Sequence, residues 1–350
     1  MSLLIYGAYG FSGALIVEEA VKRGLPVVVA GRDGPKTTAL GERLGVPHRV
    51  FGLDDPAALD AGLAGVSAVL HCAGPFSRTS AQMVSGCLRV GVHYLDITGE
   101  VDVFEAVAGN DTAARERGVM LMPGVGLDVV PTDCLAAHLK ARLPGAVRLA
   151  LALFTNGALS HGTATTMREN LHKPGAIRQG GKLVRPAVGD VSRRFDFGGE
   201  IGRRVCVRAP WGDVATAWYT TRIPDIEVFA CLPFAARVGA KFMPIFAPLL
   251  GLGFVQRQLQ ARIDAAPAGP DAAARARSGM WVYGEVADAD GRVAAARLRL
   301  IDGYDFTAHS AVAIADRVLR GEWSRGFQTP AGVFGPDFAL ELPGTRREEL

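Results

Sequence analysis

Three glycines near the start of the chain, Gly7, Gly10 and Gly13, stand three residues apart in the stretch YGAYGFSG. A turn without side chains lets backbone N–H groups approach an anion at the N-terminus of the next helix, where the helix dipole favours negative charge. The spacing GxxGxxG is a variant of the dinucleotide fingerprint. It predicts a binding site for a dinucleotide pyrophosphate rather than a purely structural turn. The candidate contacts in this turn are Gly7, Tyr9, Gly10, Phe11, Ser12 and Gly13.

The elements that must hold this turn are two strands and a helix. An apolar run over Leu3–Tyr6 and a valine-rich run over Pro26–Ala30 read as strands. Between them, Gly13, Ile16 and Val17 lie on one face of a helical pattern whose opposite face is charged. Strand, helix and strand in this order form a right-handed βαβ unit with parallel strands.

The end of the second strand predicts which dinucleotide is bound. An NAD site usually places Asp or Glu there, to hold the ribose 2′-hydroxyl. Here the strand ends in Gly31 and Arg32, and a guanidinium suits a 2′-phosphate, so the sequence favours NADP(H). Asp33 keeps the NAD alternative open, because a shift of one residue would bring a carboxylate to the ribose.

A second candidate contact is the turn that ends a later strand, over Val66–Phe76. Ligands in doubly wound folds lie at the carboxyl ends of the strands, so this turn is placed to border the cofactor. A tight turn that merely needs Gly and Pro is the alternative. The residues concerned are Cys72, Ala73, Gly74, Pro75 and Phe76.

Hydride transfer often needs a proton donor beside the cofactor. Glu100 and Asp128 follow expected strands, and His161 begins the first helix of an expected second domain. Tyr94 and Asp96, at another strand end, are further candidates. Each has a structural alternative: Asp96 and Glu100 in capping loops or helices, Asp128 in fixing the turn before Pro131, and His161 in capping its helix. A further alternative is that the enzyme acts by positioning the substrate alone, without a proton-donating side chain.

Composition excludes several classes of protein. A hydrophobic share of 49% and a net charge of +3 suit a globular chain and give no sign of nucleic-acid binding. The five cysteines form no CxxC or Cys/His pattern, and no HExxH occurs, so we expect reduced thiols and no metal site. No signal peptide precedes the first strand, which favours a cytoplasmic location.

The order of elements predicts an α/β fold: a Rossmann-type doubly wound parallel sheet with a second α+β domain built on a mixed or antiparallel sheet. We expect the dinucleotide-binding domain over residues 1–143 and the second domain, for substrate or dimerisation, over 144–303. Residues 304–350 are expected to return to the first domain. An Asp-Gly turn at Asp290-Gly291 predicts a hairpin in the second domain.

Taken in order, several stretches resemble the saccharopine dehydrogenase-like superfamily. They are YGAYGFSG with AGRD, AGPF, HYLDITGE, PGVGLDVVPTD, GTA and GFQTPAGVFG. The resemblance implies an NADP-binding oxidoreductase with a mixed-sheet second domain and a C-terminal return to the first. GxxGxxG with an Ala-Gly-Arg strand end is most similar to the trans-acting enoyl reductases, which reduce C=C bonds of carrier-bound acyl chains. Tyr9 departs from the smaller residue of many relatives.

Three functions follow as expectations. The first is reduction of a C=C bond in a hydrophobic or carrier-bound acyl substrate. C=N reduction or amino-acid-type dehydrogenation is the alternative within enzymes, and a non-catalytic lipid-associated scaffold is the alternative outside them. The apolar segment 229–259 is too broken by proline to span a membrane, so it reads as a substrate wall, a peripheral membrane contact, a core helix or a homodimer contact. Arg203, Arg204 and Arg208 are candidates for docking an acidic carrier.

Overall fold

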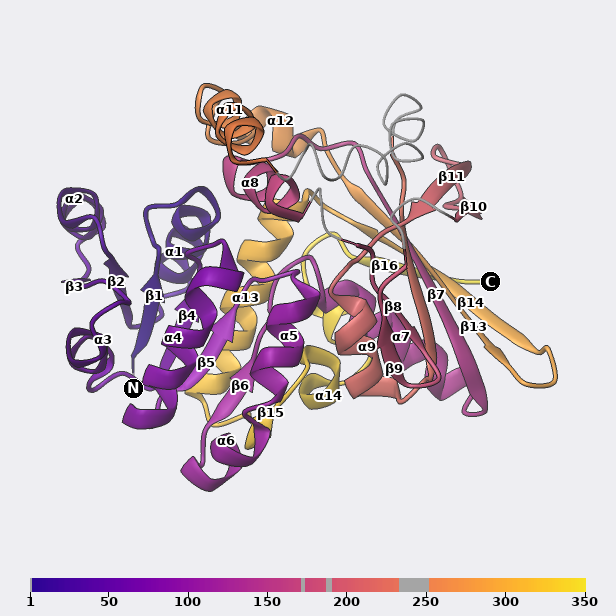
Figure 1. Cartoon of the computed structure of the whole chain (residues 1–350), viewed down its shortest axis with the longest axis horizontal. Helices are drawn as coiled ribbons and strands as arrows, with labels where there is room; N and C mark the ends of the chain where they lie inside the picture. Colours follow the sequence, from indigo (N-terminus) through magenta and orange to yellow (C-terminus); the bar gives the residue numbers. More distant parts are fainter. Residues whose placement is uncertain (1, 171–173, 187–190, 233–251) are drawn as a thin grey trace. The chain divides into compact units, whose positions relative to one another are not determined.

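The computed structural model describes residues 2–170, 174–186, 191–232 and 252–350 (Figure 1). Contacts between Cα atoms divide the chain into two compact units. The first comprises Met1–Val130 and Tyr304–Phe334, and the second Pro131–Gly303 and Gly335–Leu350. Residues 131–143 and 335–350, which the sequence analysis assigned to the first domain and its return segment, group with the second unit.

The first unit is built on a seven-stranded sheet in the order β15-β6-β5-β4-β1-β2-β3, in which every pairing is parallel. Its central strands β1, β2 and β4 are buried throughout, as expected for strands covered on both faces. The strands are β1 (Leu3–Tyr6), β2 (Val27–Gly31), β3 (His48–Val50), β4 (Ala68–His71), β5 (His93–Asp96), β6 (Met120–Met122) and β15 (Gly326–Phe327).

The helices of this unit follow the strands in alternation. Local sequence explains several of their ends: Asp33 and Asp55 cap α2 and α3 through their side chains, and Gly45, Gly91 and Gly118 end α2, α4 and α6 in the left-handed region. The helices are α1 (Phe11–Lys22), α2 (Gly34–Leu44), α3 (Pro56–Leu63), α4 (Phe76–Val90), α5 (Val101–Ala108), α6 (Asp111–Arg117), α13 (Gly303–Leu319) and α14 (Pro330–Phe334).

The second unit is built on a mixed sheet in the order β10-β11-β12-β7-β13-β14-β16, with β8 and β9 attached beside β12. Only β12 and β7 pair in parallel along this path; the other neighbours are antiparallel. The strands are β7 (Ala146–Thr155), β8 (Ile177–Gln179), β9 (Lys182–Val184), β10 (Ser192–Asp196), β11 (Arg203–Arg208), β12 (Asp225–Ala230), β13 (Met280–Asp288), β14 (Val293–Leu300) and β16 (Arg346–Glu349).

The hairpin expected at Asp290-Gly291 joins β13 and β14, and Gly291 has a φ of +85°. The Asp288 carboxylate accepts hydrogen bonds from the backbone N–H groups of Asp290 and Arg292, at 3.0 and 2.9 Å, which fixes the turn. The helical elements of the unit are α7 (Val130–Arg142), α8 (His161–Asn170), α9 (Asp213–Thr221), α11 (Gly253–Asp264), α12 (Ala272–Ala276) and the 3₁₀ turn η1 (Phe338–Glu341). A parallel sheet in the first unit and a mixed sheet in the second confirm the predicted fold class.

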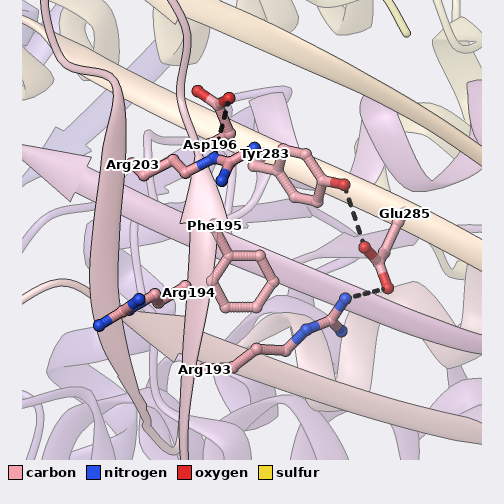
Figure 2. Close-up of a pocket in the computed structure, with 7 residues that line it drawn as sticks. All are labelled: Arg193, Arg194, Phe195, Asp196, Arg203, Tyr283 and Glu285. Atoms are coloured by element: carbon pink, nitrogen blue, oxygen red, sulfur yellow. Dashed lines mark hydrogen bonds and ion pairs between the residues drawn. The ribbon is translucent and has the colours of Figure 1, made fainter.

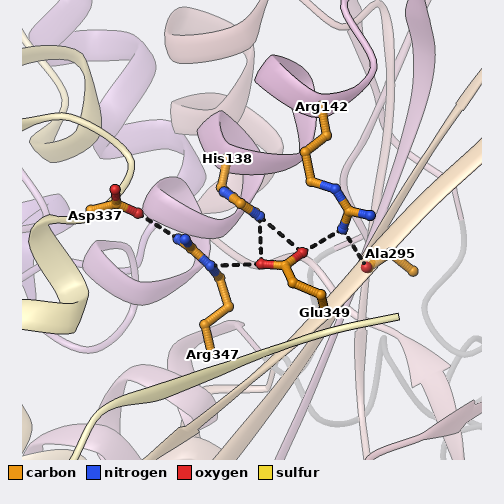
Figure 3. Close-up of polar contacts among 6 residues, drawn as sticks. All are labelled: His138, Arg142, Ala295, Asp337, Arg347 and Glu349. Atoms are coloured by element: carbon orange, nitrogen blue, oxygen red, sulfur yellow. Dashed lines mark hydrogen bonds and ion pairs between the residues drawn. The ribbon is translucent and has the colours of Figure 1, made fainter.

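Strand β16 is held to the second unit by an ionic network as well as by its pairing with β14 (Figure 3). The Glu349 carboxylate accepts hydrogen bonds from Arg142 at 2.5 Å, Arg347 at 3.0 Å and His138 at 3.1 Å. Arg347 also donates to Asp337 at 2.7 Å. Burial opposes ionisation of Glu349, but these hydrogen bonds and charges outweigh it and hold its pKa below the ordinary value.

The prediction of five reduced thiols is wrong for two of them, because Cys206 and Cys231 form a disulfide. The register of β11 and β12 explains the pairing. Val207 lies opposite Ala230, so the antiparallel ladder brings the preceding Cys206 beside the following Cys231. Their separation of 25 residues concealed this in the sequence.

Candidate cofactor site

The site lies in the first unit, where the order of strands reverses. β2 and β3 lie to one side of β1, and β4, β5 and β6 lie to the other. Ligands of doubly wound sheets bind at this switch point, outside the carboxyl ends of the central strands. The loops after β1 and β4 touch here, since a Cβ atom added to Gly7 would lie 2.8 Å from Ala73.

The three glycines build the turn after β1. Gly7 has a φ of +78°, a conformation that glycine adopts without strain. Gly10, which precedes α1, has extended backbone and no side chain to cap the helix, and the first turn of α1 contains no acidic residue. A Cβ atom on Gly13 would overlap the carbonyl oxygen of Gly7. The helix therefore begins close against the strand end with its N-terminus suited to a pyrophosphate.

At the end of β2, Arg32 and the neighbouring Asp33 have different contacts. The Asp33 side chain accepts a hydrogen bond from the Lys36 backbone N–H at 3.1 Å and pairs with the Lys36 ammonium at 3.2 Å. Asp33 therefore serves as the N-cap of α2. Arg32 is exposed and makes no ion pair among the described residues. The Tyr9 ring lies over Gly31, where any Cβ atom would overlap it. A cation and an aromatic ring at this strand end fit an adenosine 2′-phosphate.

The turn after β4 is fixed by a residue that the sequence analysis did not select, His71. Its imidazole Nε2 lies 2.9 Å from the Thr79 hydroxyl, which donates to the carbonyl oxygen of Ala73 at 2.7 Å. Burial lowers the pKa of His71 to about 3, so the ring stays neutral. Its position as the last residue of a buried strand was the available signal. The turn continues through a cis peptide between Gly74 and Pro75.

The loop after β5 supplies Glu100, whose side chain caps the N-terminus of the preceding helix, α4. Its carboxylate accepts a hydrogen bond from the backbone N–H of Phe76, the first residue of α4, at 2.9 Å. The carboxylate thus lies at the positive end of the α4 dipole. This contact joins the loop after β5 to the loop after β4, and it gives Glu100 a structural function beside any part in chemistry.

Asp96 is a buried acid that organises the same edge. It accepts hydrogen bonds from the Tyr94 hydroxyl at 2.6 Å, the Thr98 N–H at 2.9 Å and the Gly124 N–H at 2.8 Å. Burial raises its pKa to about 6, although these hydrogen bonds favour the charged form. Since its oxygens hold two loops, Asp96 positions the site.

Asp128 and His161 complete the three candidate proton donors. Asp128 follows β6 and packs on Gly99, where a Cβ atom would lie 2.9 Å from the carboxylate oxygen. Burial raises its pKa to about 6. His161 belongs to the second unit, at the start of α8, with its Nε2 2.6 Å from the carbonyl oxygen of Ala266. The first unit therefore gathers Glu100 and Asp128 with the cofactor turns.

Comparison with protein families identifies this first unit. Residues 3–122 match the saccharopine dehydrogenase NADP binding domain. The match concerns this part of the chain alone. The match confirms both the resemblance expected from the motifs and NADP(H) as the predicted cofactor. It ends at Met122, so it covers β1 to β6 and their loops.

Curated relatives match a larger part of the chain. A trans-acting enoyl reductase of Mycobacterium ulcerans is 26% identical over 231 residues, which cover 57% of this chain and 54% of that protein. A saccharopine dehydrogenase-like oxidoreductase of Bos taurus is 28% identical over 163 residues, which cover 41% of this chain and 38% of that protein. The chain thus spans about half or less of the length of these relatives.

A solved structure shares the fold over the whole chain. The saccharopine dehydrogenase (L-Glu forming) of Saccharomyces cerevisiae superposes with a TM-score of 0.69 at 13% identity, covering 100% of this chain and 99% of that one. This likeness shows the fold of this NADP-binding domain and its partner domain.

The sequence analysis expected no membrane-spanning segment and considered a peripheral membrane contact through the apolar segment 229–259. Within the described ranges, no helix has the length and apolar character needed to cross a bilayer. Of the apolar segment 229–259, residues 233–251 lie outside the described residues. Phe229 belongs to β12 and is buried, and α11 begins at Gly253. Contact of this segment with a membrane stays a prediction.

Proposed function

We propose that the protein is an NADP(H)-dependent oxidoreductase that reduces the C=C bond of a hydrophobic, carrier-bound acyl chain. The observation that carries the redox part is the glycine turn against α1, in a domain matched to NADP binding. The similarity to a trans-acting enoyl reductase over 57% of the chain supports the choice of bond. Reduction of a C=N bond, as in saccharopine-type chemistry, is the competing reaction.

The residues of the first unit have separate tasks in this reaction. The N-terminus of α1 and the glycine turn would hold the pyrophosphate, and Arg32 the 2′-phosphate. The turn from Cys72 to Phe76 would border the nicotinamide half. Bound NADPH supplies the hydride, and one proton from an acid completes reduction of the C=C bond to a saturated chain.

Asp128 is the acid that we assign to this proton. Its pKa of about 6 leaves part of the population protonated near neutral pH, which a general acid requires. Glu100 carries a hydrogen bond to the Phe76 amide, and Asp96 accepts three hydrogen bonds. These hydrogen bonds give Glu100 and Asp96 a part in positioning the loops, and Asp128 is assigned from its raised pKa and its contact with Gly99.

The test is consumption of NADPH with matched substrates. An α,β-unsaturated octenoyl thioester should be reduced, with the saturated octanoyl thioester as the blank and an imine formed from glutamate and an aldehyde as the competitor. Product analysis should show the saturated chain. Turnover of the imine alone would replace the proposal with C=N reduction. Tight NADPH binding with no turnover of either substrate would favour the scaffold alternative.

A further inference from the structure

The second unit has a pocket of about 270 Å³ beside its edge strand β10, shown in Figure 2. Charged groups that line this pocket pair with one another. Arg193 and Tyr283 both donate to the Glu285 carboxylate, at 2.5 and 3.0 Å, and Arg203 lies 3.7 Å from Asp196. These contacts hold neighbouring strands of the second sheet together. In the first unit, by contrast, side chains of one helix contact the candidate site itself.

The start of α13 contacts the turn that we assign to the pyrophosphate. The Tyr304 ring lies edge to face against the Phe11 ring, with 5.0 Å between the ring centres and 90° between the ring planes. Phe11 is the first residue of α1 and follows Gly10 directly. Farther along the same two helices, the His309 imidazole lies 2.8 Å from the Glu19 carboxylate. Two side-chain contacts therefore join α13 to α1, and one of them is at the N-terminus of α1.

The same helix contacts the loop after β6, which carries Asp128. The Thr307 hydroxyl accepts a hydrogen bond from the Leu127 backbone N–H at 3.1 Å. A Cβ atom added to Gly126 would lie 2.9 Å from the Thr307 methyl group, so the helix and the loop pack closely. Leu127 immediately precedes Asp128. The Thr307 hydrogen bond therefore fixes the backbone from which the Asp128 side chain projects.

The spacing of residues on α13 explains how one helix reaches both places. Tyr304, Thr307 and Ser310 are three residues apart, so they lie along one side of the helix. Ser310 is fully buried, and its hydroxyl donates to the Val125 carbonyl oxygen of the Asp128 loop at 2.9 Å. Packing and hydrogen bonds of this kind lock a supporting residue in one position, as precise placement of a reacting group requires.

We propose that Tyr304 and Thr307 are positioning residues, which hold the pyrophosphate turn and the Asp128 loop in a fixed relation to each other through α13. Reduction of a C=C bond adds a hydride to one carbon and a proton to its neighbour, so the cofactor and the acid must be held at a set separation. The part that concerns Asp128 rests on the proposed function. The part that concerns the pyrophosphate depends on dinucleotide binding alone.

The first experiment tests the contact between the two rings by fluorescence titration of the full chain with NADPH and with NADH. Tyr304→Ala removes the ring, and Tyr304→Phe keeps the ring and removes the hydroxyl. We expect Tyr304→Ala to weaken the binding of both nucleotides by the same factor, at least about fivefold, because both contain the pyrophosphate. Tyr304→Phe should bind both within about twofold of the wild type.

Phe11→Ala completes a double-mutant cycle with Tyr304→Ala. The double variant should lose no more affinity than the weaker-binding single variant, since either change removes the same contact. Circular dichroism verifies the fold, and Tyr304→Leu takes the place of Tyr304→Ala if the latter does not fold. Unchanged affinity without the Tyr304 ring, a loss confined to NADPH, or additive losses in the cycle would overturn the role of Tyr304.

The second experiment tests the Thr307 hydrogen bond. Thr307→Val keeps the shape of the side chain but removes the hydroxyl, and Thr307→Ser keeps the hydroxyl. We expect the Leu127 amide to exchange its hydrogen at least about tenfold faster in Thr307→Val than in the wild type, with protection largely retained in Thr307→Ser. NADPH affinity should stay within about twofold in both variants, because α1 is not touched.

Turnover of the octenoyl thioester then relates the hydrogen bond to Asp128. We expect kcat to fall by about tenfold to a hundredfold in Thr307→Val and to recover in Thr307→Ser. Unchanged amide exchange, or fast exchange with wild-type kcat, would overturn the role of Thr307. If the wild type reduces neither substrate, the proposed function fails, whereas nucleotide affinity and amide exchange still decide whether α13 holds the two loops.

Discussion

The Glu100 carboxylate accepts a hydrogen bond from the backbone N–H of Phe76 at 2.9 Å. This hydrogen bond connects the loops that follow β5 and β4. Both loops border the place where the sheet reverses its strand order. An acid selected from the sequence for its chemistry thus stabilises the start of α4 and the turn that we propose to border the cofactor. Substitutions of Glu100 can separate its contribution to NADPH binding from any contribution to proton transfer.

Glu100→Gln should keep an acceptor for the Phe76 N–H and therefore retain near-normal stability and NADPH affinity. Glu100→Ala leaves that N–H without its acceptor and should lower the free energy of unfolding by about 1–3 kcal/mol. Urea unfolding and NADPH titration measure both effects. A Gln variant with native stability but turnover reduced a thousandfold would transfer the role of proton donor from Asp128 to Glu100.

Gly13→Ala should damage both folding and cofactor binding, because the added Cβ overlaps the Gly7 carbonyl oxygen. Overpacking of this kind costs about 1–3 kcal/mol. Gly10→Ala is the matched control, since its Cβ would meet the same oxygen at 3.2 Å and Gly10 has a negative φ. We expect chemical unfolding to show a loss in the Gly13 variant well above that in the control. Equal stabilities would argue against the close packing of helix and strand.

Asp128 should give the reaction a dependence on pH. With a pKa of about 6 it is protonated below that pH, so kcat/KM should fall as pH rises through about 6. Asp128→Asn should remove this limb and lower kcat by roughly 10²–10⁴-fold. A pH profile unchanged by the substitution would exclude Asp128 as the proton donor.

The same shift makes a prediction for stability. The folded-state pKa of Asp128 lies above its ordinary value of 3.8, so the neutral carboxyl stabilises the fold at low pH, and this contribution is lost as pH rises through about 6. Asp128→Asn stays neutral throughout. Its melting temperature relative to the wild type should therefore increase between about pH 5 and about pH 8. A constant difference would contradict the raised pKa of Asp128.

Glu349→Gln should loosen the last strand of the second sheet. The carboxylate is half exposed, so solvent screening limits the loss to about 1 kcal/mol or less. Because its folded-state pKa is lowered, the wild type has this stabilisation above the ordinary pKa of 4.5 and loses it as pH falls through the folded value. Hydrogen exchange of the β16 amides at neutral and acid pH would detect it. Identical protection in both proteins would assign the strand's stability to backbone pairing alone.

Much of this architecture could be predicted from the sequence, because local patterns encode it. The glycine turn, the valine-rich second strand and the Asp-Gly hairpin each depend on residues adjacent in the chain. What the sequence did not reveal depends on pairing between distant segments. The Cys206–Cys231 disulfide follows from strand register, and the Glu100–Phe76 bond joins residues 24 apart. His71 went unnoticed because its role depends on Thr79 and burial.

The proposed contact of Arg32 with the 2′-phosphate concerns a choice of cofactor that the local sequence left open. Arg32 and Asp33 are adjacent and would favour different cofactors. The structure uses Asp33 to cap α2 and leaves Arg32 exposed. Arg32→Ala should accordingly weaken NADPH binding at least about tenfold and leave NADH affinity within about twofold, as a contact to the 2′-phosphate requires. Equal losses for both nucleotides would remove Arg32 from cofactor selection.

The most direct test of the central claim is a fluorescence titration of the purified protein with NADPH and, separately, with NADH. The account predicts saturable NADPH binding with a preference of at least about tenfold over NADH, which corresponds to about 1.4 kcal/mol. Tighter binding of NADH, or binding of neither nucleotide, would contradict it.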